Sequence, residues 1–131
     1  MPRKLGLLER LFGQRLAREG IAWVEASNGM VWKLDLAHPC ERWIVYGDYE
    51  GPAQMGWLRR WLNRGGVVID SGANIGQMAL YLAPLPGVEL FAFEPLPSAA
   101  DWLEECLGRY PKWAVRVIRK GLSSADETVI M

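Results

Sequence analysis

The chain has 131 residues, of which 50% are hydrophobic and 23% are charged, and these figures are ordinary for a globular domain with an apolar core. Its 15 Lys and Arg residues balance 15 Asp and Glu residues, so the net charge of zero does not indicate a nucleic-acid partner. No apolar run is long enough to span a bilayer, and the N-terminus lacks the cleavage site of a signal peptide. We therefore expect a cytoplasmic protein.

The two cysteines and the single histidine form no recognisable reactive or metal-binding motif. Cys40 and Cys106 are far apart and have no C-x-x-C spacing, which argues against a disulfide scaffold and against a metal site. We expect both to be small buried residues in a reducing compartment. His38 lies close to Cys40 in the sequence, but such adjacency is not the geometry of a catalytic Cys–His pair.

The first 50 residues predict a helix followed by a small antiparallel unit. Apolar residues recur at helical spacing over 5–19, and Gly20 is a stop signal. We interpret this helix as a docking element at the edge of the domain; a membrane-surface helix is the alternative. Strands over 21–26 and 30–36 flank Asn28-Gly29, which predicts a two-residue turn with positive φ at both positions. Residues 42–46 predict a third strand.

Residues 51–131 predict a second domain in which strands and helices alternate. A helical apolar stripe begins near Pro52 and ends at Gly65-Gly66. The segments that follow alternate between strand and helix: strand 67–69, helix 75–83, strand 88–93, helix 98–109 and strand 114–118. This order predicts an α/β fold with a parallel sheet and crossover helices. The uniformly apolar strand 67–69 predicts helices on both faces of the sheet.

A carboxylate and a glycine-rich turn follow the first of these strands. The segment reads Val67-Val68-Ile69-Asp70-Ser71-Gly72-Ala73-Asn74-Ile75-Gly76-Gln77. Glycine lets the backbone turn sharply and lets a ligand approach the main chain, and Asn74 is the non-glycine type that best tolerates left-handed geometry. In a doubly wound sheet, ligands bind at this carboxyl end of the strands. The alternative for Asp70 is a purely structural role, capping the helix or tying down the turn.

A second carboxylate, Glu94, follows the next parallel strand in Phe91-Ala92-Phe93-Glu94-Pro95. Neighbouring parallel strands end at the same edge of a sheet, so we expect Glu94 to face the same crevice as the glycine-rich turn. A carboxylate there can accept two hydrogen bonds from a ribose diol. Together, the two motifs favour a nucleotide-containing ligand more strongly than either does alone.

These motifs resemble the FkbM-type family of class I S-adenosylmethionine-dependent methyltransferases. The resemblance rests on the segments 67–76 and 91–95, and it covers roughly residues 43–131. Upstream, Gly47-Asp48-Tyr49-Glu50 is similar to a Gly-x-Tyr-Glu stretch of the family. Downstream, residues 118–124 are similar to its third strand and the Ala-Leu-Ser-Asp stretch after it, with glycine for alanine and serine for aspartate.

The resemblance implies a fold, a cofactor and roles for individual residues. The fold would be a partial doubly wound, Rossmann-like parallel sheet, and the cofactor would be S-adenosylmethionine. Asp70, Gly72, Asn74 and Gly76 would shape the pocket for the methionine moiety, Glu94 would hold the ribose, and the stretch around Gly121-Leu122 would lie near the adenine. Tyr49 and Glu50 would border the pocket, although a helix-start region before Pro52 is the favoured interpretation of these two residues. The methyl acceptor would be a hydroxyl group of a small molecule or glycan.

Two other functional classes remain open from the sequence. A nicotinamide-dependent oxidoreductase would share the fold, but its G-x-G-x-x-G turn differs from Asp70-x-Gly72-x-Asn74-x-Gly76. A non-catalytic binding domain of the same fold is the third class. Family members continue beyond a third strand, so we expect this chain to hold the cofactor-binding half without a complete acceptor pocket. We also expect self-association through an open edge of the sheet.

Overall fold

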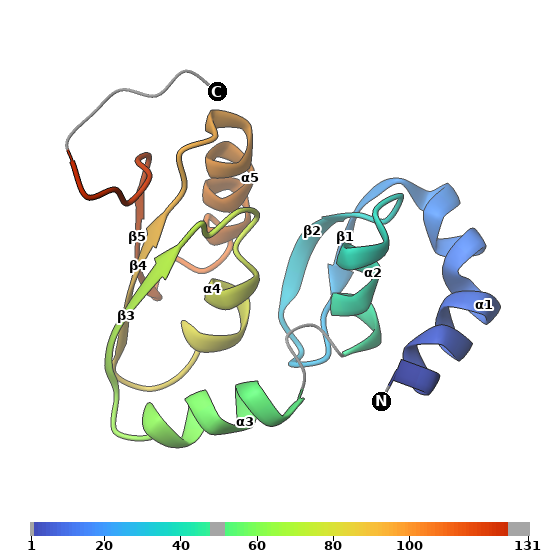
Figure 1. Cartoon of the computed structure of the whole chain (residues 1–131), viewed down its shortest axis with the longest axis horizontal. Helices are drawn as coiled ribbons and strands as arrows, with labels where there is room; N and C mark the ends of the chain where they lie inside the picture. The colour runs from blue at the N-terminus through green and yellow to red at the C-terminus, as the bar shows by residue number, and fades with distance from the viewer. Residues whose placement is uncertain (1, 48–51, 126–131) are drawn as a thin grey trace. The chain divides into compact units, whose positions relative to one another are not determined.

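The computed structural model describes residues 2–47 and 52–125 (Figure 1). The chain divides into two compact units, Met1–Trp57 and Leu58–Met131, and helix α3 (Pro52–Trp61) contains residues of both. Tyr49 and Glu50 lie outside the described residues. Each unit is considered by itself below.

The first unit contains two helices and a two-stranded antiparallel sheet. Helix α1 (Pro2–Glu19) ends at Gly20, whose φ of 62° is left-handed, so the predicted helix and its stop are confirmed. Strand β1 (Ile21–Glu25) pairs with strand β2 (Val31–Asp35), and helix α2 (Pro39–Tyr46) follows. The fully buried side chains of this unit come from β2 and α2: Trp32, Leu34 and Ile44.

The hairpin between β1 and β2 has a different turn from the predicted one. Ala26 N–H donates to the Met30 carbonyl at 2.8 Å, which leaves a loop of three residues, 27–29. Of these, only Gly29 has a positive φ, at 79°. Asn28 instead accepts a hydrogen bond from Met30 N–H through its side-chain oxygen at 3.1 Å. The loop matches the three-residue hairpin class with glycine in the left-handed position.

The strand predicted over residues 42–46 is wrong, because these residues belong to α2. Pro39 occupies the first turn, where its missing N–H has no cost, and Gly47 ends the helix in a left-handed conformation with φ 73°. These boundary signals outweigh the strand preference of the short apolar run from Trp43 to Tyr46. The antiparallel sheet of this unit therefore has two strands within the described residues.

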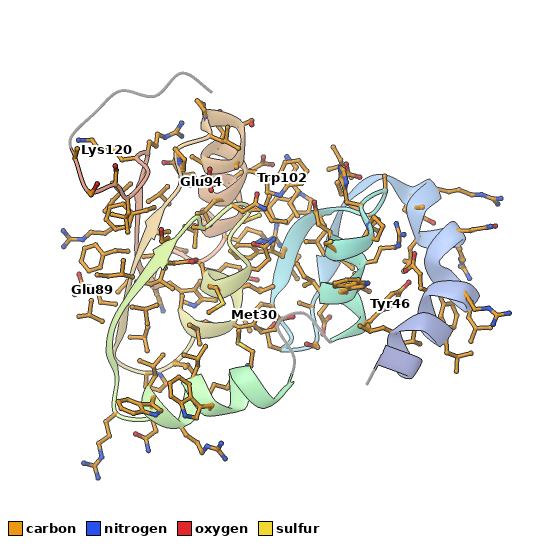
Figure 2. All side chains as sticks on the ribbon, in the orientation of Figure 1. Met30, Tyr46, Glu89, Glu94, Trp102 and Lys120 are labelled. Atoms are coloured by element: carbon orange, nitrogen blue, oxygen red, sulfur yellow. The ribbon has the colours of Figure 1, made fainter. Side chains whose placement is uncertain are left out.

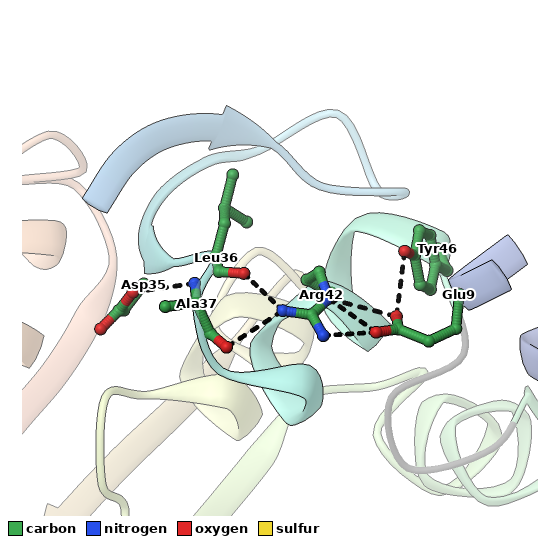
Figure 3. Close-up of polar contacts among 6 residues, drawn as sticks. All are labelled: Glu9, Asp35, Leu36, Ala37, Arg42 and Tyr46. Atoms are coloured by element: carbon green, nitrogen blue, oxygen red, sulfur yellow. Dashed lines mark hydrogen bonds and ion pairs between the residues drawn. The ribbon is translucent and has the colours of Figure 1, made fainter. Parts of the chain in front are cut away.

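A cluster of charged side chains joins α1 to α2 (Figure 3). Arg42 is only 5% exposed, and its guanidinium donates to the Glu9 carboxylate and, at 2.6 Å, to the Leu36 carbonyl. Tyr46 donates its hydroxyl to the same carboxylate at 3.1 Å. A Cβ on Gly13 would lie 2.6 Å from Glu9 Oε1, so the glycine leaves the room that this carboxylate occupies.

The second unit is a Rossmann-like α/β arrangement, as predicted. Its elements follow in the order β3 (Gly66–Ser71), α4 (Gln77–Leu82), β4 (Val88–Phe93), α5 (Pro97–Leu107) and β5 (Ala114–Ile118). The three strands are parallel, and β4 lies between β3 and β5. The core is formed by fully buried residues of α4, β4 and α5: Ala79, Leu80, Leu82, Leu90, Ala92, Ala100, Leu103 and Cys106.

Helices α4 and α5 lie on the same side of this sheet (Figure 1). On that side, Val68 lies beside Leu90 in the parallel register. On the other side, Val67 and Ile69 are 64% and 65% exposed. The prediction that helices cover both faces of strand 67–69 is therefore wrong within the described residues, because an apolar strand sequence does not by itself reveal which faces are covered.

Two glycines bring the start of β3 against the start of β4. Gly65 has a φ of 81°, and a Cβ on it would lie 2.4 Å from the Gly87 carbonyl oxygen. Gly66 N–H donates to the same oxygen at 3.0 Å. This close approach of two backbones leaves no space for a side chain at position 65.

Candidate functional site

The glycine-rich turn leaves β3 and enters α4 through three left-handed residues. The φ angles are 80° at Gly72, 50° at Asn74 and 89° at Gly76, so the expectation that Asn74 adopts left-handed geometry is confirmed. Gly72 and Ala73 both donate their N–H groups to the Phe93 carbonyl at 2.9 Å, which anchors the turn to the end of β4. A Cβ on Gly72 would have nothing within 4 Å, so this part of the turn is open to an approaching ligand.

Glu94 lies directly after β4 and is only 4% exposed (Figure 2). One carboxylate oxygen accepts the Asn74 N–H at 2.7 Å, and the other accepts the Leu96 N–H at 2.8 Å. The Glu94 N–H donates to the Ile118 carbonyl at the end of β5, at 3.0 Å. Glu94 therefore connects the glycine-rich turn, the β4–α5 loop and the end of β5.

Asp70 lies in β3 and pairs in register with Ala92, on the side of the sheet that carries the helices. Its Oδ2 atom is inaccessible to solvent. The sequence left two interpretations of Asp70 open: a structural role in the turn, and a role in shaping the cofactor pocket. The placement of Asp70 agrees with both.

The segment after β5 passes beside the end of β4. A Cβ on Gly121 would lie 3.8 Å from the ring of Pro95, the residue that follows Glu94, and the next residue, Leu122, is 54% exposed. The structure thus gathers the predicted cofactor residues of the described chain around the carboxyl ends of β3 and β4: Asp70, Gly72, Asn74, Gly76, Glu94 and Leu122. Tyr49 and Glu50, the other predicted pocket residues, lie outside the described residues.

Sequence reasoning missed the main-chain groups that complete this arrangement. The Leu96 N–H and the Phe93 carbonyl each hold part of the site through backbone atoms. Every non-proline residue carries the same two backbone groups, so residue type gives no signal for them. Only the pairing of β3 with β4 places them beside the turn.

The first unit contains a groove of about 690 Å³ between α1, β1 and α2. Its walls are mostly apolar, and none of the predicted cofactor residues contributes to them. The lining residues are Leu8, Phe12, Arg15, Leu16, Glu19, Ala22, Trp23, Val24, Leu36, Val45 and Tyr46. The groove therefore lies apart from the residues that carry the predicted chemistry.

The reactive side chains outside the site are dispersed. Cys106 is buried as expected, but Cys40 is exposed in the first turn of α2, so the prediction that both cysteines are buried is wrong for Cys40. Across residues 2–47 and 52–125, no three His, Cys, Asp or Glu side chains come close enough to hold a metal ion. No helix in the same part of the chain is both long and apolar enough to cross a membrane.

Comparisons with known proteins support the fold more directly than the function. The chain matches no protein-family model. Over 61 residues it is 48% identical to AMB antimetabolite synthetase AmbE of Pseudomonas aeruginosa, a match that covers 46% of this chain and 3% of AmbE. This short match does not establish the FkbM-type family.

Two solved structures from Pyrococcus horikoshii share the fold. TYW2, crystallised in complex with MeSAdo, aligns with a TM-score of 0.55 at 19% identity over 77% of this chain. PH0793 aligns with a TM-score of 0.54, also at 19% identity over 77% of this chain. In both cases the alignment covers 36% of the solved chain, so this protein spans about a third of the length of those neighbours.

Proposed function

We propose that this chain carries the S-adenosylmethionine-binding half of a class I methyltransferase domain, most similar to the FkbM type. The observation that carries the proposal is the pairing of the turn with Glu94: the buried carboxylate accepts the Asn74 N–H at 2.7 Å. A strand-end carboxylate that holds a glycine-rich turn at the carboxyl ends of adjacent parallel strands is suited to a nucleoside ligand. The fold shared with TYW2, which was solved with MeSAdo, supports the same proposal.

The residues present fit such a cofactor. Gly72 leaves an open approach to the main chain of the turn, where the methionine moiety would lie. A carboxylate has about four lone-pair sites, so Glu94 retains acceptor capacity for ribose hydroxyls beyond its two backbone bonds. The exposed Leu122, beside the β4–α5 loop, would contribute apolar surface near the adenine. Tyr49 and Glu50 would border the same pocket.

The cofactor would supply an electrophilic methyl group, and the proposed acceptor is a hydroxyl of a small molecule or glycan. Transfer requires the acceptor oxygen to be held in line with that methyl group. The residues assigned here bind and orient the cofactor, and none is assigned as a general base. We therefore expect the 131-residue chain to bind cofactor without turnover, and methyl transfer by the purified chain to any hydroxyl acceptor would contradict this expectation.

Calorimetric titration with S-adenosylhomocysteine and, separately, with NAD tests the proposal. We expect S-adenosylhomocysteine to bind and Glu94→Ala to weaken it by about 1–3 kcal/mol, since the substitution removes charge-assisted hydrogen bonds. Glu94→Gln should also weaken binding: the Asn74 and Leu96 N–H groups donate to different carboxylate oxygens, and in glutamine an NH2 group, which only donates, would face one of them. Glu89→Ala is the matched control: Glu89 is on the same strand, but on the sheet face opposite the helices (Figure 2).

Each outcome has a clear meaning. Tight binding of NAD without binding of S-adenosylhomocysteine would overturn the methyltransferase proposal in favour of a nicotinamide-dependent oxidoreductase. Binding that survives Glu94→Ala unchanged would remove Glu94 from the site. Binding of neither ligand would favour a non-catalytic domain of the same fold.

A further inference from the structure

A cluster of ion pairs lies where the chain leaves β5. Arg119 is the first residue after that strand, and its guanidinium donates at 2.6 Å to a carboxylate oxygen of Asp101 and at 2.6 Å to one of Glu104. The two carboxylates are three positions apart in α5, so they lie on the same face of the helix. The cluster therefore ties the segment after β5 to α5.

The same two elements also meet at Glu94. Leu96, directly before α5, donates its N–H to the Glu94 carboxylate at 2.8 Å, and the Glu94 N–H donates to the Ile118 carbonyl at 3.0 Å. That carbonyl also accepts the Lys120 N–H at 2.8 Å, which makes a three-residue turn centred on Arg119. Lys120 lies at the same end of the sheet as Glu94 (Figure 2). Glu94 thus joins the start of α5 to the end of β5 through the backbone, and Arg119 joins them through side chains.

The Arg119 cluster is better suited to orienting a segment than to stabilising the unit. Its three side chains are between 43% and 68% exposed, and exposed ion pairs contribute little to the stability of a domain. Arg119 nevertheless bonds to Glu104 through two of its nitrogens and to Asp101 through one, and the rigid guanidinium fork makes such bonds strongly directional. The expected consequence is a defined path for the chain after β5.

That path leads past the candidate site. Two residues beyond Arg119, a Cβ on Gly121 would lie 3.8 Å from the ring of Pro95. The next residue, Leu122, is 54% exposed and is the one proposed above to contribute apolar surface near the adenine. Because so few residues separate Leu122 from Arg119, fixing the arginine restricts where the leucine can lie.

We propose that Arg119 is a positioning residue for the nucleoside end of the cofactor site. It acts through Asp101 and Glu104, which hold the segment that carries Leu122 in place before the ligand arrives. A segment that is already ordered reduces the entropy cost of binding. The role rests on the proposed cofactor-binding function, since it concerns the site assigned there.

Calorimetric titration of the full chain with S-adenosylhomocysteine tests this role. Arg119→Ala should weaken binding by about three- to tenfold, the range that corresponds to ordering one or two side chains on binding. Arg116→Ala is the matched control, because Arg116 is an exposed arginine of β5 whose ion pair, at 3.7 Å, is with Glu89 and does not involve α5. The control variant should bind with unchanged affinity.

Two combinations of substitutions distinguish positioning from direct contact with the ligand. Asp101→Ala together with Glu104→Ala keeps the arginine but removes its partners, and it should weaken binding as much as Arg119→Ala does. Unchanged or tighter binding in this double variant would show that Arg119 binds the ligand itself, and it would overturn the positioning role. The losses from Arg119→Ala and Leu122→Ala should be less than additive, because both act on the same segment; fully additive losses would also overturn the proposal.

Hydrogen exchange in the absence of ligand provides an independent readout. The Lys120 N–H, which donates to the Ile118 carbonyl, should exchange faster in Arg119→Ala, while the amides of β4 should keep their rates. Unchanged exchange at Lys120 would overturn the proposal whatever the ligand. Failure of the unaltered chain to bind S-adenosylhomocysteine would overturn the proposed function and this role with it, whereas binding that survives Arg119→Ala unchanged would overturn the role of Arg119 alone.

Discussion

Among the described residues, each unit buries one charged side chain, and the two side chains form different kinds of hydrogen bonds. Arg42 in the first unit is 5% exposed, and Glu94 in the second is 4% exposed. Arg42 forms an ion pair with the Glu9 side chain on a different helix and donates to the carbonyls of Leu36 and Ala37. Glu94 instead accepts two backbone N–H groups, those of Asn74 and Leu96.

The difference indicates different roles for the two buried charges. A side-chain ion pair between α1 and α2 stabilises the packing of those helices and depends on both side chains being charged. A carboxylate bonded to two backbone N–H groups instead determines the paths of two loops, and those loops border the candidate cofactor site. We therefore regard the Arg42 cluster as structural and Glu94 as part of the site.

The largest effect is expected from Gly65→Ala in the second unit. Position 65 is left-handed, which costs a non-glycine residue about 1–2 kcal/mol, and the new Cβ would meet the Gly87 carbonyl at 2.4 Å. With the overpacking cost of about 1–3 kcal/mol, we expect a loss of about 4 kcal/mol in the stability of this unit. Hydrogen exchange should show faster opening across residues 66–118.

Gly29→Ala is the control that measures the cost of the left-handed backbone conformation without overpacking. Gly29 is also left-handed, at φ 79°, but a Cβ there would have nothing within 4 Å. The loss of stability should therefore be only the cost of placing alanine in a left-handed conformation, about 1–2 kcal/mol. Equal losses from both substitutions would show that the approach of Gly65 to Gly87 is less tight than the structure indicates.

A somewhat smaller effect is expected from Glu9→Ala in the first unit. The substitution leaves Arg42 buried without its carboxylate, and breaking a buried pair costs about 3–5 kcal/mol. Glu9 itself is partly exposed, so we expect the lower end, about 3 kcal/mol. Exchange should accelerate in residues 21–46 and change little in β4. Glu19→Ala, on the same helix, has no described ion pair and should change stability by less than about 0.5 kcal/mol.

If Glu9→Ala and Gly65→Ala each accelerated hydrogen exchange equally in both units, the two units would unfold together. This result would contradict the expectation that each substitution destabilises only its own unit. If Glu9→Ala behaved like Glu19→Ala, the Arg42 cluster would contribute little to the packing of α1. Either result is readily distinguished from the expected pattern, in which each substitution acts on its own unit.

The smallest effect is expected from a change of pH. The contributions of two glutamates to the stability of the first unit should change in opposite directions as pH changes. The hydrogen bond from Arg42 lowers the pKa of Glu9 below its ordinary value of 4.5, so the stability from this group is present above pH 4.5 and is lost as pH falls through the lowered folded-state pKa. Burial raises the pKa of Glu41, so its contribution is fullest below pH 4.5 and is lost as pH rises through the raised folded-state pKa.

Glu41→Gln separates these two contributions. The amide oxygen can still accept the Asp35 N–H that Glu41 accepts at 2.6 Å, but the buried charge is gone. We expect this variant to stabilise the first unit at pH 7 by less than about 1 kcal/mol, with the gain disappearing below pH 4.5. Urea unfolding between pH 7 and pH 3 measures the difference. A gain that grows as pH falls would have the wrong sign for a carboxyl group with a raised pKa.

Local sequence signals predicted much of the fold and of the candidate site. The alternation of apolar runs and breaker residues predicted the three parallel strands and the two helices between them, because each of these segments has its own periodicity and boundaries. The positions of Asp70 and Glu94 at adjacent strand ends followed from the same alternation. The resemblance of these motifs to a methyltransferase family then predicted which ligand they would hold.

The errors arose where a short run could adopt either conformation. The segment from Arg42 to Tyr46 is apolar enough for a strand, but the proline before it and the glycine after it make it a helix. At Asn28-Gly29 the residue types allow a two-residue turn, whereas the observed pairing of Ala26 with Met30 gives a three-residue loop. In both cases neighbouring residues beyond the motif determined the result.

The sequence by itself determined the alternation of strands and helices in the second unit, the left-handed positions of the glycine-rich turn and the presence of a carboxylate at the end of each of the first two parallel strands. Only the tertiary structure showed that Glu94 holds Asn74 and Leu96 through their backbones, that Arg42 binds Glu9 across 33 positions, and that β4 lies between β3 and β5. The physical reason is that periodicity and turn preferences act over a few residues, whereas these contacts join segments that only packing brings together.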